Sequence, residues 1–566
     1  MKRFISVLLA VLTVLTLAGC SSPSSGEISE TTEAVTEAVI PDIPMEYRSV
    51  TSVGGGNTLL YMNNLELNNT ADPCIVPVKE GNRICFYLYV TGIKGYYSYD
   101  LTSWISISNV FPKPSGAWSK ESYWAPEVMY DEEAGLYRMF YSAKSHEGYY
   151  YISMATSESP KGPFVNWTGT NADGLEITKT TPIYDFSRMD KSHPLYEGVI
   201  RAIDVSPFID PETGDKYLYW VRGWNDGGTV RHDTSEVWGM KMKDWQTPDY
   251  STVTRLTELG KITPGGAKTR HGETSINEGP AMLYKDGTYF LTYSINPASY
   301  KGYSVWQATS DSPLGTFTKI AKEKGGMVLG VDSYWDHASG TGHHNFFTVG
   351  DQIYIVYHAH TMREYTSMGD RAVAFDRCEW ATNADGDTVL HANGPTWSPM
   401  PQLEVVSGYE NAASSASITV TGFSDGAAAY LTDSIINMHE RGAQPEAEFT
   451  GTATVTLKWD APRKMRALLL YNSAFLEKAF GKIDRVEFDC VLEDGKTETR
   501  VIADAVYNAE EYVSNSLGTT YVRPGAALIL RLTDATDVQE IRITVTVPDG
   551  QESAAFAEIE ALAKPQ

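Results

Sequence analysis

Asn277-Glu278-Gly279-Pro280-Ala281-Met282-Leu283-Tyr284-Lys285-Asp286-Gly287-Thr288-Tyr289-Phe290-Leu291-Thr292-Tyr293-Ser294 is the segment from which the architecture of this chain can be inferred. An acid stands before a Gly-Pro pair and an apolar run, and an Asp-Gly turn then leads into an alternating aromatic strand. This order of residues is typical of a β-hairpin. The segment therefore predicts a hairpin with a carboxylate at its entrance.

The same pattern occurs four more times, and each copy has an ionisable residue near its start. The five starts are spaced by about 55, 77, 74 and 65 residues, and they are Asp72, Glu127, Asp204, Glu278 and His343. A unit of this length that recurs with turn signals indicates one four-stranded blade per copy, so we expect an all-β, five-bladed propeller. The innermost strands of a propeller line one axis, so the five side chains should converge on one pocket. One acid beside Pro and Gly is usually a turn residue, but five copies favour a site.

These segments resemble glycoside hydrolase family 43, whose members are five-bladed propellers acting on arabinose- and xylose-containing polysaccharides. The resemblance spans roughly residues 60 to 400, with motifs in blade order. The motifs are Ala71-Asp72-Pro73, Trp124-Ala125-Pro126-Glu127, Ala202-Ile203-Asp204, Asn277-Glu278-Gly279-Pro280 and Gly340-Thr341-Gly342-His343. The resemblance implies an inverting hydrolase that cleaves arabinofuranosyl or xylosyl linkages in plant-type polysaccharides or oligosaccharides.

Glycoside hydrolysis needs one carboxylic acid and one carboxylate. The resemblance implies that Asp72 is the general base, that Glu278 is the general acid, and that Asp204 orients Glu278 and raises its pKa. Inversion implies that base and acid lie roughly 6.5–9.5 Å apart. No role follows for Glu127.

The resemblance also implies substrate-binding residues. His343 lines the pocket in this interpretation, or helps to hold a calcium ion coordinated mostly by water, and the alternative is a hydrogen-bonded interior histidine. The adjacent His344 makes the ligand ambiguous. Arg371 resembles an arginine that reaches the sugar. Tryptophans that could stack on sugars are Trp118, Trp124, Trp224 and Trp335. No cofactor is required for this chemistry, and calcium would be structural.

The N-terminus predicts export. Residues 1–20 have two basic residues, a short apolar core and Leu17-Ala18-Gly19-Cys20, which resembles a bacterial lipobox. We expect lipid on Cys20, a flexible Ser/Thr/Glu-rich tether over residues 21–50, and anchoring at the bacterial cell envelope or surface. A simple cleaved signal peptide is the alternative.

The propeller is expected over residues 51–402, and a second domain over residues 403–566. Val455, Leu457 and Trp459 alternate, and so do Ile541, Ile543, Val545 and Val547. Period-two patterning predicts a β-sandwich, and the ending resembles jelly-roll-like, galactose-binding accessory domains. Such a domain either binds sugar or supports the propeller, and the sequence leaves both open.

Composition excludes several partners. The formal net charge of −25 argues against nucleic acid or anionic lipid as a partner. The family resemblance implies a carbohydrate partner, and membrane contact is expected only through lipid on Cys20. The cysteines beyond Cys20 form neither a disulfide framework nor a zinc pattern, and buried free thiols are expected. Galactosidase activity, a non-catalytic glycan-binding propeller and a fructan-acting propeller are the alternatives. The presence of both Asp72 and Glu278 argues against a non-catalytic propeller.

Overall fold

The computed structural model describes residues 59–63, 67–224, 227–269, 271–331, 339–361, 368, 370–439, 443–514 and 518–566. The predicted signal peptide, its lipobox and the tether lie outside these residues, as does Trp335. None of the helices in these ranges is both long enough and apolar enough to span a bilayer.

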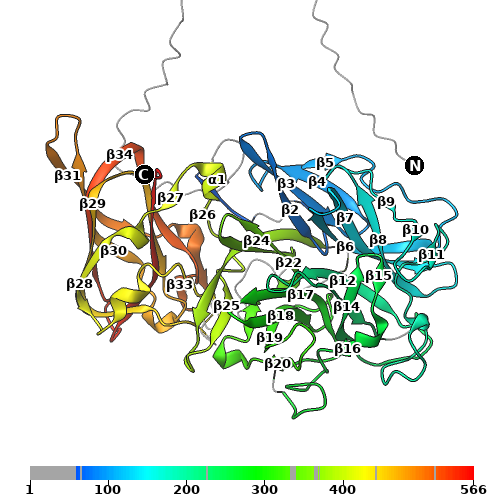
Figure 1. Cartoon of the computed structure of the whole chain (residues 1–566). Helices are drawn as coiled ribbons and strands as arrows, with labels where there is room; N and C mark the ends of the chain where they lie inside the picture. The colour runs from blue at the N-terminus through cyan, green and yellow to red at the C-terminus, as the bar shows by residue number, and fades with distance from the viewer. Residues whose placement is uncertain are drawn as a thin grey trace, which may run out of the picture. The chain divides into compact units, whose positions relative to one another are not determined.

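Five antiparallel sheets follow one another along residues 74–392, which confirms the five-bladed propeller (Figure 1). The first two blades contain β2 (Cys74–Glu80), β3 (Arg83–Val90), β4 (Lys94–Ser98) and β5 (Ile105–Ile107), then β6 (Ser119–Asp131), β7 (Leu136–Ser145), β8 (Tyr150–Ser157) and β9 (Val165–Asn166). The third contains β12 (Ala202–Ile209), β13 (Lys216–Arg222), β14 (Glu236–Asp244), β15 (Thr247–Pro248) and β16 (Thr254–Arg255). The fourth contains β17 (Asn277–Lys285), β18 (Thr288–Ile295), β19 (Ser304–Ser310), β20 (Thr318–Lys319) and β21 (Met327–Leu329). The fifth contains β22 (Ser339–Val349), β23 (Gln352–His360), β24 (Arg371–Thr382) and β25 (Thr388–Ala392).

The second strand of each blade forms the core. It pairs with a strand on each side and is buried on both faces, so its residues read as a continuous apolar and aromatic run rather than an alternation. Fully buried tyrosines on these strands are Tyr87, Tyr89, Tyr141, Tyr219, Tyr293 and Tyr357.

The start of the propeller is fastened to its fifth blade. β1 (Leu60–Tyr61) pairs with β26 (Met400–Pro401). Asn63 accepts a hydrogen bond from the Phe375 N–H at 3.1 Å and donates one to the Phe375 carbonyl at 2.9 Å. These contacts close the ring of blades where the chain enters and leaves it.

The inner strand of every blade contains a residue in the left-handed backbone region, or in the first blade closely follows one. In β6, β12, β17 and β22 the pairing skips two residues at this place, as in a β-bulge. The left-handed residues are Asp72 (φ 56°), Ala125 (φ 43°), Asp204 (φ 55°), Gly279 (φ 54°) and His343 (φ 46°). This finding corrects the expected equivalence of the five ionisable residues. Glu278 stands one residue before the left-handed residue of its blade, and Glu127 stands two residues after that of its own blade.

Residues beyond the propeller form the expected β-sandwich, after a single helical turn α1 (Glu404–Ser407). Its strands are β27 (Glu410–Asn411), β28 (Ser417–Phe423), β29 (Ala447–Asn472), β30 (Lys482–Val491), β31 (Thr497–Val506), β34 (Ala527–Thr546) and β35 (Ala554–Ala563). The first part of β29 pairs with β28 and the end of β34, and its last part pairs with β35 and the start of β34. Both halves of these long strands contribute to one buried cluster, so the sheet folds over a single core. The small ribbons β10 (Gly169–Thr170) with β11 (Glu176–Ile177), and β32 (Tyr512–Ser514) with β33 (Thr520–Val522), complete the strands.

One hydrophobic cluster contains residues of both the propeller and the sandwich. Ile75 and Phe86 of the first blade and Phe375 of the fifth share it with Leu469 and Tyr471 of β29. Buried polar contacts accompany it, because Arg377 pairs with Glu560 at 2.8 Å and Asn393 donates to the Ser434 carbonyl at 2.8 Å. The sandwich therefore covers apolar propeller surface, which favours the supporting role over that of a freely attached binding module.

Replacing Leu469 by alanine tests this coupling. Leu469 is fully buried in the shared cluster, so the change should lower the free energy of unfolding by about 2–5 kcal/mol. All described tryptophans except Trp459 lie in the propeller, so intrinsic fluorescence during denaturation reports propeller unfolding. We expect the fluorescence midpoint to fall. An unchanged midpoint would mean that the propeller unfolds independently of the sandwich.

Candidate active site

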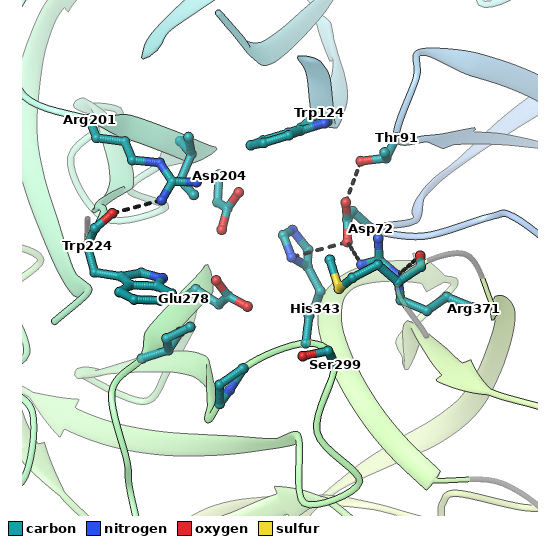
Figure 2. Close-up of a pocket in the computed structure, with 15 residues that line it drawn as sticks. Asp72, Thr91, Trp124, Arg201, Asp204, Trp224, Glu278, Ser299, His343 and Arg371 are labelled. Atoms are coloured by element: carbon teal, nitrogen blue, oxygen red, sulfur yellow. Dashed lines mark hydrogen bonds and ion pairs between the residues drawn. The ribbon is translucent and has the colours of Figure 1, made fainter. Parts of the chain in front are cut away.

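A pocket of about 460 Å³ lies where the inner strands of all five blades meet. Every blade supplies part of its lining (Figure 2). The residues expected there and found there are Asp72, Trp124, Asp204, Trp224, Glu278, His343 and Arg371. The structure thus brings together side chains that lie about 300 residues apart in the chain.

A ring of hydrogen bonds between neighbouring blades fixes these positions. The N–H of each left-handed residue is bonded to a group of the preceding blade. In four of five cases that group is a side chain at an equivalent place on the second strand or, for Thr91, directly after it. The bonds run from Ala125 to Thr91 Oγ1 (3.0 Å), from Asp204 to Ser142 Oγ (2.9 Å), from Gly279 to Asp204 Oδ2 (3.3 Å), from His343 to Ser294 Oγ (2.8 Å) and from Asp72 to His358 Nδ1 (3.3 Å). In the third blade the equivalent second-strand residue is Val221, and the Asp204 carboxylate accepts the bond instead.

Asp72 is held as a carboxylate. Arg371 Nη1 lies 3.1 Å and His343 Nδ1 lies 3.4 Å from its Oδ1, and the Thr91 hydroxyl donates to its Oδ2. Burial alone would raise the pKa of Asp72, but the positive charges of His343 and Arg371 outweigh it, so the pKa lies well below its usual value. The group is therefore ionised across the physiological range.

His358 contacts Asp72 without adding charge. Its Nδ1 lies 3.4 Å from Asp72 Oδ1, a distance that would make an ion pair if the ring were protonated. Burial, together with Arg371, lowers the pKa of His358 to about 3. Nδ1 of the neutral ring instead accepts the Asp72 backbone N–H.

Glu278 is held toward its protonated form. Burial, and then the negative charge of Asp204, raise its pKa to about 7, against opposing contributions from His343 and Tyr303. Burial and Asp72 also raise the pKa of Asp204. Because Asp204 accepts the N–H of Gly279, which follows Glu278 directly, Asp204 both fixes this turn and acts electrostatically on the acid.

His343 lies between the carboxyl groups, with Asp72 on one side of its ring and Asp204 and Glu278 on the other (Figure 2). Burial lowers its pKa, but Asp72, Asp204 and Glu278 together raise it above the usual value. The expectation of a pocket histidine thus agrees with its place in the structure. His344 points away, into the fourth blade, where its Nε2 lies 2.7 Å from Thr292 Oγ1.

The residues at the axis do not fit a protein-held calcium ion. The described part of the chain contains no group of three His, Cys, Asp or Glu side chains that could hold a metal. His343 Nδ1 lies 3.4 Å from Asp72 Oδ1, so this ring nitrogen is turned toward the carboxylate.

The tryptophans expected to stack on sugars divide into two groups. Trp124 lines the pocket and stacks on Tyr150 at 5.1 Å, and Trp224 lines it with 38% of its surface exposed. Trp118 does not line the pocket, contrary to expectation. It is buried in the core between the first two blades, stacked on Tyr141. Trp118 directly precedes β6 and lies seven residues before the left-handed Ala125, so it is not at the part of the strand that lines the pocket.

Several pocket residues were not identified from the sequence. Arg201 lines the pocket, places its guanidinium 4.9 Å from the Tyr150 ring and donates to the Trp224 carbonyl at 2.8 Å. Thr91, Ser299 and Met368 also line it. Arg201 directly precedes the Ala202-Ile203-Asp204 motif and could have been found there, whereas the others carry no motif.

Glu127 does not belong to the pocket lining. Burial raises its pKa to about 8, against hydrogen bonds from Ser206 and Asn345. It stands two residues after the left-handed Ala125, which explains why it does not share the position of the other carboxyl groups. The four described cysteines are free and buried, including Cys74 and Cys85. The Asn383–Asp387 segment, which faintly resembles a calcium loop, is the turn between β24 and β25.

Comparisons with known proteins agree with this site. The sequence profile of glycosyl hydrolases family 43 matches residues 63–386. The chain is 26% identical over 303 residues to a β-D-galactofuranosidase of Aspergillus niger, covering 51% of this chain and 72% of that relative. It is 25% identical to an arabinoxylan arabinofuranohydrolase of Paenibacillus polymyxa, covering 47% of this chain but only 38% of that relative. A crystal structure of a thermostable family-43 glycoside hydrolase is 24% identical, with a TM-score of 0.44, covering 60% of this chain and 98% of that one.

The matched region includes all five blades' inner strands and the carboxyl groups of Asp72, Asp204 and Glu278. Enzymes of this family hydrolyse glycosidic bonds with inversion at the anomeric carbon. The chain belongs to glycosyl hydrolases family 43 and is a glycoside hydrolase.

Proposed function

We propose that the protein hydrolyses arabinofuranosyl or xylosyl linkages in plant-type polysaccharides or oligosaccharides. The observation that carries this proposal is the pair of carboxyl groups whose surroundings shift their pKa values in opposite directions within one pocket. Asp72 is held ionised by cations, and Glu278 is held partly protonated near pH 7 by burial and by Asp204. Such a split is what general base and general acid require.

The proposed mechanism is a single displacement. Asp72 accepts a proton from a water molecule as its oxygen bonds to the anomeric carbon. Glu278 donates its proton to the glycosidic oxygen as the carbon–oxygen bond to the leaving group breaks. Asp204 keeps Glu278 protonated until that step. Return of a proton from Asp72 to Glu278 through solvent restores the enzyme.

Sugar selection is assigned to the pocket wall. Trp124 presents an indole supported from behind by Tyr150, and Trp224 presents a second, more exposed indole. Flat aromatic surfaces of this kind stack on the apolar faces of sugar rings. Arg201 and Arg371 add hydrogen-bond donors for hydroxyl groups. Galactofuranosyl substrates are a second candidate, because one relative is named as a β-D-galactofuranosidase. Nitrophenyl glycosides of the three sugars, together with arabinan and arabinoxylan, distinguish these substrates.

The roles of the two carboxyls predict different leaving-group behaviour. Glu278→Gln should slow cleavage of natural linkages by about 10²–10⁴-fold while sparing aryl glycosides, whose leaving groups need little protonation. Asp72→Asn should slow both classes alike, because water must be activated in either case. Rates on matched alkyl and aryl glycosides measure this difference. The same leaving-group dependence in both variants would contradict the assignment.

The reaction is proposed to need no metal. Treatment with a chelator should leave kcat on an aryl glycoside unchanged, because Asp72 is already balanced by Arg371 and His343. Alternatively, the chelator could remove activity that added calcium restores. If His343→Gln abolished this restoration, the result would show that this histidine holds a mostly water-coordinated calcium ion.

We further propose that the enzyme is exported and anchored by lipid on Cys20 at the bacterial cell envelope. This proposal rests on Leu17-Ala18-Gly19-Cys20 and the polar segment after it, all outside the described residues. Cys20→Ala should move the protein from the membrane fraction to the soluble fraction, and it should remove labelling by a fatty-acid analogue. An unlabelled wild-type protein would contradict the proposal.

A further inference from the structure

Two fully buried aromatic side chains, Tyr303 and His358, connect the two carboxyls without lining the pocket. Tyr303 directly precedes β19 of the fourth blade, and His358 lies on β23 of the fifth. Neither belongs to the pocket lining, so neither is expected to touch the sugar. Their contacts nevertheless lead directly to both carboxyl-bearing residues.

Tyr303 holds the proposed acid. Its hydroxyl donates to Glu278 Oε1 at 2.9 Å. Burial, and then the charge of Glu278, raise the pKa of Tyr303 well above its usual value, so the hydroxyl remains a donor. Glu278 Oε1 therefore accepts the Tyr303 hydroxyl, and Oε2 is left for the glycosidic oxygen.

The Tyr303 ring is held in place by contacts with the fifth blade. It stacks on the His358 ring with centroids 5.5 Å apart and planes 15° apart. It also packs against the backbone of β22, since a Cβ on Gly342 would lie 2.6 Å from two ring carbons. The glycine before His343 is thus required by the close approach of Tyr303.

His358 holds the proposed base. It occupies the place that a serine or threonine hydroxyl takes in three other blades, and its Nδ1 accepts the Asp72 N–H. A hydroxyl would suffice for that bond, as Thr91, Ser142 and Ser294 show. Only a larger ring also reaches Tyr303. Histidine thus replaces the serine or threonine at the junction between the fifth blade and the first blade, which carries Asp72.

We propose that Tyr303 and His358 form one positioning unit that fixes the proposed acid and base relative to each other. The inference rests on the proposed function, because it assigns these residues to the support of Glu278 and Asp72. In one continuous path, Glu278 is bonded to Tyr303, Tyr303 stacks on His358, and His358 is bonded to Asp72. An inverting enzyme depends on this separation, because a water molecule must fit between base and substrate.

Tyr303→Phe is the decisive variant, since it removes only the hydroxyl. Without the donor, Glu278 can rotate, so we expect about a tenfold loss of kcat on alkyl glycosides and a smaller loss on aryl glycosides. The ionised form of Glu278 also loses a hydrogen bond, which raises its pKa. The charged and titratable groups that face Glu278 are Asp204, His343, Asp72 and Tyr303, and only the last changes. The alkaline limb of kcat/KM should therefore move to higher pH by about one unit.

Tyr293→Phe is the matched control. Tyr293 lies on β18 of the same blade and is fully buried, and its hydroxyl has no hydrogen-bond partner among the residues that the structure describes. This variant should keep the wild-type leaving-group dependence and pH profile. If Tyr303→Phe behaves like Tyr293→Phe, the proposal is wrong.

His358→Phe tests the other half of the unit. It keeps a flat ring against Tyr303 but removes the acceptor for the Asp72 N–H, so rates on alkyl and aryl glycosides should fall by a similar factor. His358→Asn, which retains a small acceptor, is the alternative if the first variant does not fold. In the double variant that carries His358→Phe and Tyr303→Phe, the factor by which kcat falls should be smaller than the product of the factors for the two single variants, as expected for coupled residues. Fully multiplicative losses would overturn the idea of one unit.

Failure of the proposed function gives a different result. A wild-type protein inactive on every glycoside tested would refute the function itself. An active wild type whose alkaline limb does not move in Tyr303→Phe would refute only the positioning unit.

Discussion

The hydrogen bond from each left-handed residue to the preceding blade is the interaction on which the rest of the structure depends. Left-handed backbone costs about 1–3 kcal/mol at a residue other than glycine, and four of the five positions are not glycine. The conformation persists because it turns each N–H toward the neighbouring blade, where a side chain or carboxylate accepts it. The ring of five bonds holds the blades together at the axis and points the side chains into one pocket.

The proposed roles of the carboxyl groups follow from small differences between the blades at these left-handed positions. Asp72, Asp204 and His343 occupy the left-handed position itself, while Glu278 precedes it and projects from the adjacent residue. Because Val221 has no polar group, the bond between the third and fourth blades falls to Asp204. The carboxylate that tunes Glu278 is thus also the one that fastens the turn carrying it. Its structural and electrostatic effects on the acid arise from one position.

The repeat in the sequence was sufficient to predict the five blades and the meeting of Asp72, Asp204, Glu278 and His343, and the alternation beyond the repeat was sufficient to predict the sandwich. The repeat could not give the register of the bulges, because an acid one residue before the left-handed residue and another two residues after it look alike in the chain. Glu127 was aligned with the others for that reason. Trp118 shows a second limit, since a tryptophan near a motif can pack in the core. Tyr303 and His358 carry no motif, and their roles depend on contacts between blades.

The position of the sandwich is explained by the same ring. Its shared cluster with the propeller is formed by the first and fifth blades, which are also the blades that supply Asp72, His343 and Arg371. Between these blades the propeller has no continuous chain to hold it closed. The contacts that cross the junction include the pairing of β1 with β26 and the hydrogen bonds of Asn63, Thr70 and Asp72. A domain that buries apolar surface of both blades opposes their separation. The sandwich contributes no group to the pocket, yet it stabilises the junction at which the ionised carboxylate meets its cations.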